Sequence, residues 1–289
     1  VLYIYRWFAA HADNLLARAL AWSHDHPVLG RYSMAVFDPQ RRESVSLALL
    51  AVMLIAFGWI AFAFLALVIG HGEPLAIDLA IHESMLALRN PLADHPMAAL
   101  ASLGDVEVLA PASLLVLGYL TWRKRWMAAA HWLAALAFGL ALTAWLGAMV
   151  DFPRPPAVAT GFSFPSISIT MSTICFGFFA VLIARELPGR KRIWPYMVSG
   201  IVVALIGFAR IYLGAHWLSD VIGGMLLGIF WLLVLGIAYR RRTVRSFWMK
   251  PLAILFYGAV AIAALWHAPR NIEPMLAQFE VPQTTSTMV

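Results

Sequence analysis

The sequence predicts an all-α fold: a polytopic membrane helical bundle of six core transmembrane helices, with a candidate seventh. Of its 289 residues, 62% are hydrophobic and only 12% are charged, with a mean hydropathy of +0.78. About a quarter of the residues of a soluble domain are charged. The apolar residues form several long runs, and about 20 such residues cross the ~30 Å hydrocarbon core as a helix. Since backbone polar groups in lipid must be satisfied within the chain, these runs are expected to be helical.

The first 44 residues are expected to lie at the membrane surface. Aromatic, alanine and leucine residues alternate there with arginines. Such a mixture is typical of an amphipathic interfacial helix and not of a span.

Apolar runs then mark the spans in order along the chain. Six are expected at 45–70, 106–122, 126–150, 167–184, 194–209 and 217–239, and the candidate seventh at 251–268, with Pro251 at one end and His267 at the other. In the loop 71–105, the stretch LAIDLAIHESMLALR mixes apolar and acidic residues, which indicates a short interfacial helix. We therefore expect a membrane domain over residues 45–245, followed over residues 246–289 by the candidate seventh helix and a polar tail.

The basic residues predict the orientation. Of the 21 Lys and Arg, 17 fall in segments that alternate to one side of the membrane, and only Arg89, Arg154, Arg210 and Arg270 fall on the other. Positive charge marks the cytoplasmic face. Both termini of the six-helix core are therefore expected in the cytoplasm, and the loops after the first, third and fifth spans outside, which in a bacterial inner membrane means the periplasm.

Other classes of protein are disfavoured. The net charge of +6 does not indicate nucleic-acid binding, because the basic residues cluster at the ends of apolar runs. The single cysteine, Cys175, excludes a disulfide framework. No metal or other cofactor is expected, because the histidines, His267 among them, show no ligand spacing with partner carboxylates at one membrane level.

Polar residues near the last outer loop form a candidate site. In ARIYLGAHWLSD, His216 follows Arg210 by six residues, and Asp220 follows four later on the same face of a helix start. Asp220 can accept a hydrogen bond from one imidazole nitrogen and leave the other free to attack a substrate. Arg154, in a separate outer loop, opens on the same side. Taken singly, Asp220 or Ser219 would serve as an N-cap, and the arginine and histidine would mark the membrane interface.

The string ARIYLGAHWLSDVIGG resembles the third motif of the type 2 phosphatidic acid phosphatase superfamily, whose members are integral lipid phosphatases. That motif reads Ser-Arg, five residues, His, three residues, Asp, and here Ala209 stands in place of Ser. The family's other motifs are Lys-x6-Arg-Pro and Pro-Ser-Gly-His. FPRPP supplies Arg154 and Pro155, and FSFPSISIT supplies Pro165 and Ser166, each in the expected outer loop. The likeness covers roughly residues 71–240.

The chain departs from these motifs at four positions. Gly147 stands where the family has Lys, and Phe152 where an Arg is often found. After Pro165-Ser166, Ile167 replaces Gly and Ser168 replaces His. The resemblance therefore implies a site that lacks two cations, a glycine and the acid that protonates the leaving oxygen.

The resemblance implies that His216 attacks phosphorus, that Asp220 orients it, and that Arg154, Arg210 and Ser166 hold the phosphoryl group. The implied substrate is an anionic lipid such as a polyprenyl diphosphate or phosphatidate, cleaved at a reduced rate. Two alternatives stay open: an inactive relative that binds or passes anionic lipids, and a membrane anchor for a domain at the N-terminus. The oligomeric state is not indicated by the sequence.

Overall fold

The computed structural model describes Arg18, Ala21 and residues 42–156, 163–240 and 249–279. These residues form helices joined by short connections, with no strand among them. The chain divides into two compact units, Val1–Ala56 and Phe57–Val289, and the packing below is that of the second. The expected surface segment at 1–44 falls almost entirely outside the described residues, as do residues 280–289 at the end of the expected polar tail.

The helices follow the predicted runs closely. The six core helices are α3 (Arg42–His71), α6 (Val106–Trp122), α7 (Trp126–Val150), α8 (Ile167–Ala184), α9 (Ile193–Tyr212) and α10 (Leu218–Arg240), and the seventh is α11 (Met249–Gln278). Seven helical segments of the described chain are long and apolar enough to cross a membrane. The prediction of a polytopic helical bundle is confirmed, and the candidate seventh span is present.

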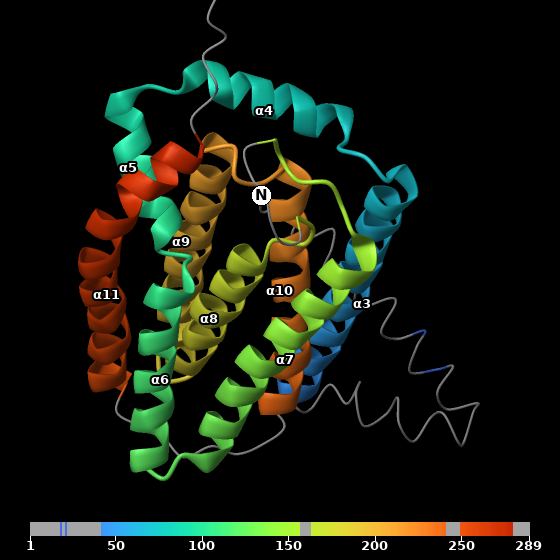
Figure 1. Ribbon diagram of the computed structural model, residues 1–289. Helices are drawn as coiled ribbons and strands as arrows, with labels where there is room; N and C mark the ends of the chain where they lie inside the picture. Colours follow the sequence, from blue (N-terminus) through green and yellow to red (C-terminus); the bar gives the residue numbers. More distant parts are fainter. Residues whose placement is uncertain (1–17, 19–20, 22–41, 157–162, 241–248, 280–289) are drawn as a thin grey trace, which may run out of the picture. The chain divides into compact units, whose positions relative to one another are not determined.

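The loop after α3 contains the expected helix, α4 (Ala76–Leu88), and one that was not expected, α5 (Pro91–Ser102). α4 runs across the ends of the neighbouring helices (Figure 1). The α5 sequence was missed because prolines and polar residues interrupt its apolar pattern, yet its start carries ordinary signals: Asn90 accepts from Ala93 N–H, and a proline fills the first turn.

The last helix is longer than predicted. α11 does not end at His267 but continues to Gln278 through two prolines, Pro269 and Pro274. The polar residues after His267, which looked like the end of a span, therefore lie on helical turns.

α8 is the central helix. In its apolar stretch 72% of the residues are buried, against 6% for the first candidate span, and it packs against α7, α9 and α10 (Figure 1). Small residues allow the close approach: a Cβ atom on Gly139 of α7 would lie 2.3 Å from Ile174 of α8, and one on Gly228 of α10 would lie 2.7 Å from Thr173 of α8. Helices in lipid associate through such contacts between small residues. This packing fixes the relative positions of the starts of α8 and α10, and both of these helix starts carry polar residues.

α4 is fixed above the start of α10 by one buried carboxylate. Asp78, 1% exposed, accepts from the backbone N–H of Leu75 (3.0 Å) at the start of its own helix and from that of Ser219 (2.8 Å) on α10. Helix starts leave such N–H groups without intrahelical partners. Asp78 therefore satisfies both helix starts and holds α4 beside the turn between α9 and α10.

Candidate active site

His216 lies in the turn between α9 and α10, with 11% of its side chain exposed. Its Nδ1 is 3.3 Å from Oδ2 of Asp220, which is fully buried in the first turn of α10. Because a carboxylate only accepts hydrogen bonds, this contact assigns the proton to Nδ1 and leaves a lone pair on Nε2. The same Oδ2 accepts from Ser163 Oγ (2.7 Å) and from the Trp217 backbone N–H (2.9 Å). Asp220 thus orients the histidine and also caps the helix, so the two interpretations of this residue are compatible.

Ser166 joins the start of α8 to the histidine. Its Oγ is 3.2 Å from Nε2 of His216 and 3.3 Å from Oγ of Ser168, and its backbone N–H donates to the backbone oxygen of Asp220 (3.2 Å). Ser166 stands at the N-cap of α8 but makes no side-chain cap bond. The N–H groups of the first turn therefore remain oriented as a helix N-terminus presents them to an anion.

Two glycines allow α10 to approach this segment. A Cβ atom on Gly223 would lie 2.4 Å from the ring of Phe164, and one on Gly224 would lie 2.9 Å from the backbone oxygen of Ser166. Neither contact leaves room for a side chain. The Gly-Gly pair that follows the third motif therefore lets α10 carry Asp220 against the start of α8.

Arg154 is brought to the site by a bond from the same turn. The indole Nε1 of Trp217 donates to the carbonyl oxygen of Pro153 (2.8 Å), which fixes the FPRPP segment beside His216. Burial lowers the pKa of Arg154, and the charge of Asp220 partly offsets this effect. Arg154 is half-buried, so a cation from this segment lies within electrostatic range of Asp220 and His216.

Arg210 approaches from the last turn of α9 but is already engaged. Its Nη2 forms an ion pair with Asp105 Oδ1 and donates to the carbonyl oxygen of Ala101 (3.3 Å). Its Nε is buried and has no hydrogen-bond partner among the described residues. Arg210 is therefore held by the last turn of α5 and by Asp105 at the start of α6, partners that the motif did not indicate.

The environment keeps His216 neutral. Burial lowers its pKa, the charges of Arg210 and Arg154 lower it further, and the hydrogen bond and charge of Asp220 oppose this. A neutral imidazole with its proton on Nδ1 is the form that can act as a nucleophile at Nε2. The two arginines and Asp220 all influence this one ring, although they come from distant parts of the chain.

The four departures from the motifs lie on or beside these elements. Phe152 is 5% exposed and belongs to an apolar cluster with Val68, Phe164 and Trp217. Ile167 is 37% exposed in the first turn of α8. Ser168 follows it within hydrogen-bond distance of Ser166, and Gly147 is buried near the end of α7.

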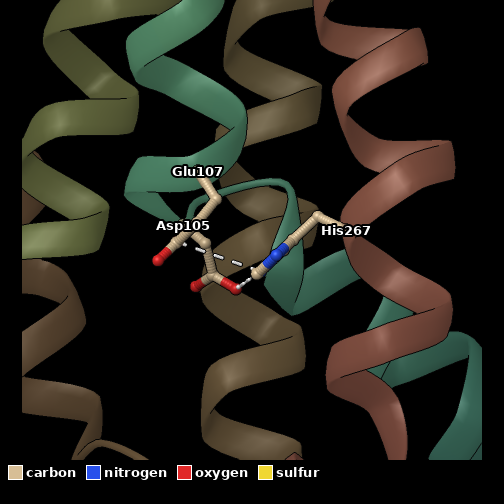
Figure 2. Close-up of side chains that lie close together, drawn as sticks. All are labelled: Asp105, Glu107 and His267. Atoms are coloured by element: carbon tan, nitrogen blue, oxygen red, sulfur yellow. Dashed lines mark hydrogen bonds and ion pairs between the residues drawn. The ribbon is translucent and has the colours of Figure 1, made fainter.

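His267 does have carboxylate neighbours, contrary to the prediction. Its Nε2 lies 2.9 Å from Oδ2 of Asp105 and 3.9 Å from Oε2 of Glu107 (Figure 2). These residues lie at 105–107 and 267, and only the packing of α11 against α5 and α6 brings them together. No spacing within the sequence indicates this cluster.

An apolar pocket adjoins the start of α8. Phe164 and Pro165 form one wall, and the others come from α3 between Gly58 and Leu65, from Leu146 of α7, and from α10. Pro165 immediately precedes Ser166, so the pocket and the polar site share one segment of chain.

Part of the chain is similar to a known protein family. Residues 132–245 match the sequence model of the PAP2 superfamily. The chain is therefore similar to this superfamily over less than half of its length. It is 27% identical over 177 residues to phosphatidylglycerophosphatase B of Bacillus subtilis (strain 168), covering 58% of this chain and 86% of that protein. The crystal structure of a transmembrane PAP2-type phosphatidylglycerolphosphate phosphatase from Bacillus subtilis superposes with a TM-score of 0.57 and 25% identity, over 64% of this chain and 97% of the other. These relatives support an integral membrane lipid phosphatase.

The predicted site residues lie within the range that matches the PAP2 model. This range includes Arg154, Ser166, Arg210, His216 and Asp220, and the structure brings the last two and Ser166 into direct contact. Sequence reasoning missed Ser163, although it lies within FSFPSISIT, and it missed Asp105, which lies outside the matched residues.

Proposed function

We propose that the protein hydrolyses a phosphate or diphosphate ester of a membrane lipid, with His216 as the nucleophile. The Nε2 lone pair attacks the terminal phosphorus, and a bond from nitrogen to phosphorus forms. In a monoester the bond from phosphorus to the lipid oxygen breaks and the lipid alcohol leaves; in a diphosphate the phosphoanhydride bond breaks and the lipid phosphate leaves. Water then cleaves the phosphohistidine and releases phosphate. Asp220 stabilises the charge that develops on the imidazole, and Arg154, Arg210 and the N–H groups at the start of α8 hold the phosphoryl oxygens.

One observation carries the proposal: Nδ1 of His216 contacts a buried carboxylate, while its Nε2 faces the start of a helix. A nucleophile held on one side by an orienting acceptor, and facing an anion-binding helix start on the other, is suited to phosphoryl transfer. The adjoining apolar pocket suits the hydrocarbon chain of a lipid. Phosphatidylglycerophosphate, named for the Bacillus relatives, joins polyprenyl diphosphate and phosphatidate among the candidate substrates.

The experiment is phosphate trapping. The purified protein in detergent is mixed with 32P-labelled lipid phosphate, quenched with alkali, and assayed for acid-labile phosphate on histidine. We expect label on the wild type and none on His216→Ala. Asp220→Asn is expected to retain the fold but to label slowly, because an amide favours the other tautomer. Label that persists in His216→Ala would overturn the proposed nucleophile.

The missing acid predicts a preference among leaving groups. A lipid alkoxide must be protonated as it leaves, whereas a lipid phosphate leaving from a diphosphate is already a stable anion. General acid catalysis contributes ~10²–10⁴-fold, and Ser168 carries a hydroxyl where the family has His. We expect phosphate release to be faster from polyprenyl diphosphate than from phosphatidate. Equal rates, or faster monoester cleavage, would contradict this expectation.

A second candidate function is binding of anionic lipid without turnover. Phe152 in its apolar cluster and the ion pair of Arg210 with Asp105 favour it, because both reduce the positive charge available to phosphate. Under this alternative, lipid phosphate binds with a dependence on Arg154 and Arg210 and no phosphate is released.

We further propose that the site faces the periplasm of a bacterial inner membrane. Of the 21 Lys and Arg, 17 fall in segments expected on the opposite, cytoplasmic face, and only four arginines fall on the face of the site.

A further inference from the structure

Asp105 is the centre of a polar network that the proposed reaction has not used. Its carboxylate, 14% exposed, accepts from three side chains on two other helices: Arg210 Nη2 on α9, and His267 Nε2 (2.9 Å) and Asn271 Nδ2 (3.1 Å) on α11. Figure 2 shows His267 extending from α11 toward Asp105. The network therefore joins the site arginine to a helix that lies outside the PAP2 match.

The position of Asp105 indicates that this network is its main role. Asp105 stands at the N-cap of α6, where an aspartate ordinarily accepts a backbone N–H of the first turn. Here it makes no such cap bond. Both carboxylate oxygens turn instead to α9 and α11, at the expense of its own helix start.

The ion pair leaves Arg210 anchored on one side only. Nη2 is used by Asp105 and Ala101, while the buried Nε has no partner among the described residues. A buried donor without a partner is unfavourable unless a ligand satisfies it. The backbone oxygen of Arg210 accepts from the N–H of Ala215, the residue before His216 (3.0 Å), and the charge of Arg210 also acts on His216. The anchored arginine and the proposed nucleophile therefore belong to the same turn of the chain.

We propose that Asp105 is a positioning residue for Arg210, and that His267 and Asn271 hold Asp105 in place for this task. α11 then contributes to the phosphate site through these two residues, although it lies outside the residues that match the PAP2 model. The inference rests on the proposed function, because it assigns the guanidinium to the phosphoryl oxygens. A preorganised donor stabilises the transition state without reorganisation during the reaction.

A metal ion fits the same cluster less well. Asp105, Glu107 and His267 offer ligand atoms within 4.8 Å of one another. However, the carboxylate of Asp105 already accepts three donors, and one of them is a guanidinium whose charge would repel a divalent cation. The contacts therefore favour positioning over metal binding.

The first test compares Asp105→Asn with Asp105→Glu by steady-state phosphate release from lipid phosphate in mixed micelles. We expect Asp105→Asn to lower kcat about tenfold with little change in KM, less than the ~10²–10³ lost when an oxyanion donor is removed outright. Asp105→Glu should recover part of the loss. Glu273→Gln, on α11 at a residue that pairs with His95, is the matched control and should keep wild-type kinetics. A lower KM in Asp105→Asn would show that Asp105 competes with phosphate, and would overturn the proposal.

The second test uses His267→Gln and Asn271→Leu, which leave both partners of the Arg210–Asp105 ion pair in place. These variants still test the positioning role if Asp105→Asn does not fold. Binding of orthovanadate, measured by calorimetry, reports on the anion site without turnover. We expect each variant to bind orthovanadate several-fold more weakly than the wild type or Glu273→Gln, with His267→Gln closer to wild type because its amide can still donate to Asp105. Unchanged binding and kinetics in both folded variants would overturn the proposal and leave a structural role.

Two further outcomes separate the hypotheses. If the wild type binds orthovanadate but releases no phosphate, the proposed activity fails while the positioning role is still decided by binding. If it binds no orthovanadate, both fail. A gain of activity or binding with added Zn²⁺ that disappears in Glu107→Gln would replace positioning with a metal site.

Discussion

The pKa of His216 is the residue property on which the proposed reaction most directly depends. Burial and two arginines lower it, and Asp220 raises it only in part. The proposed nucleophile is active when neutral, so a lowered pKa extends its active form to more acidic solutions than an ordinary histidine, half protonated near ~6.5, would allow.

We therefore expect the acidic limb of the kcat/KM profile to have its midpoint below pH ~6.5. Phosphate release from a lipid diphosphate, measured across the pH range on protein whose fold is monitored in parallel, gives this midpoint. A midpoint at or above the ordinary histidine value would mean that the environment of His216 does not favour the neutral ring.

Restoring the family's residues one at a time should have opposite effects at two positions. Ser168→His, in the first turn of α8, is expected to increase monoester cleavage by up to ~10²-fold, because it adds an acid beside Ser166. Ser168→Gln, similar in size without an acid, is its control. Monoester rates that are equal in the two variants would show that position 168 cannot serve as the acid.

Phe152→Arg should instead lower thermal stability in detergent. Phe152 is 5% exposed among Phe164 and Trp217, and an unpaired guanidinium there would be buried at a cost of at least several kcal/mol. Phe152→Leu is the control, since it keeps the cluster apolar. A stable Phe152→Arg variant would show that the cluster can open to admit a cation.

At the scale of elements, the apolar runs predicted the spans well because lipid demands long uninterrupted apolar segments. The segments missed were those in which polar residues sit on helical turns: α5, with its prolines, and the second half of α11. His216 and Asp220 were indicated by their spacing and Ser166 by the motif resemblance, because each belongs to a short segment of chain. Asp105 and His267 were not, because their partners lie more than 100 residues away.

The contact between α8 and α10 provides a test at this scale. Gly224→Ala places a Cβ atom 2.9 Å from the Ser166 backbone oxygen, so the two helix starts must separate. We expect lower thermal stability and at least a tenfold loss of phosphate release, since ~1 Å of misplacement can lower a rate ~10²-fold. Gly236→Ala, on the same helix with nothing within 4 Å, should keep both properties. Equal stability and equal activity of the two variants would mean that the contact at Gly224 does not fix the geometry of the site.

At the scale of the molecule, the polar site and the apolar pocket meet at one segment, Phe164–Ser166. This arrangement suits an amphiphile whose phosphate enters the polar site and whose hydrocarbon chain enters the apolar pocket. Residues of α3 complete the pocket, so this helix is expected to influence which lipids are cleaved, although the motif residues lie elsewhere.

We expect Ala61→Trp, which fills the pocket from α3, to raise KM for long-chain lipid phosphates about tenfold and to leave a short-chain, water-soluble analogue unaffected. Ala63→Trp, the same change at an exposed position of α3, is the control. Phosphate release from lipids of graded chain length provides the measurement. Equal effects on long and short chains would assign the hydrocarbon tail to another surface.

Two of the bonds that join the motif segments use none of the proposed functional groups: Ser166 N–H to the Asp220 backbone oxygen, and the Trp217 indole to the Pro153 carbonyl. The first joins main chain to main chain, and the second needs only the indole of Trp217. The framework can therefore tolerate the loss of individual functional groups, and a lineage with this framework can reduce or redirect its chemistry before it loses its architecture.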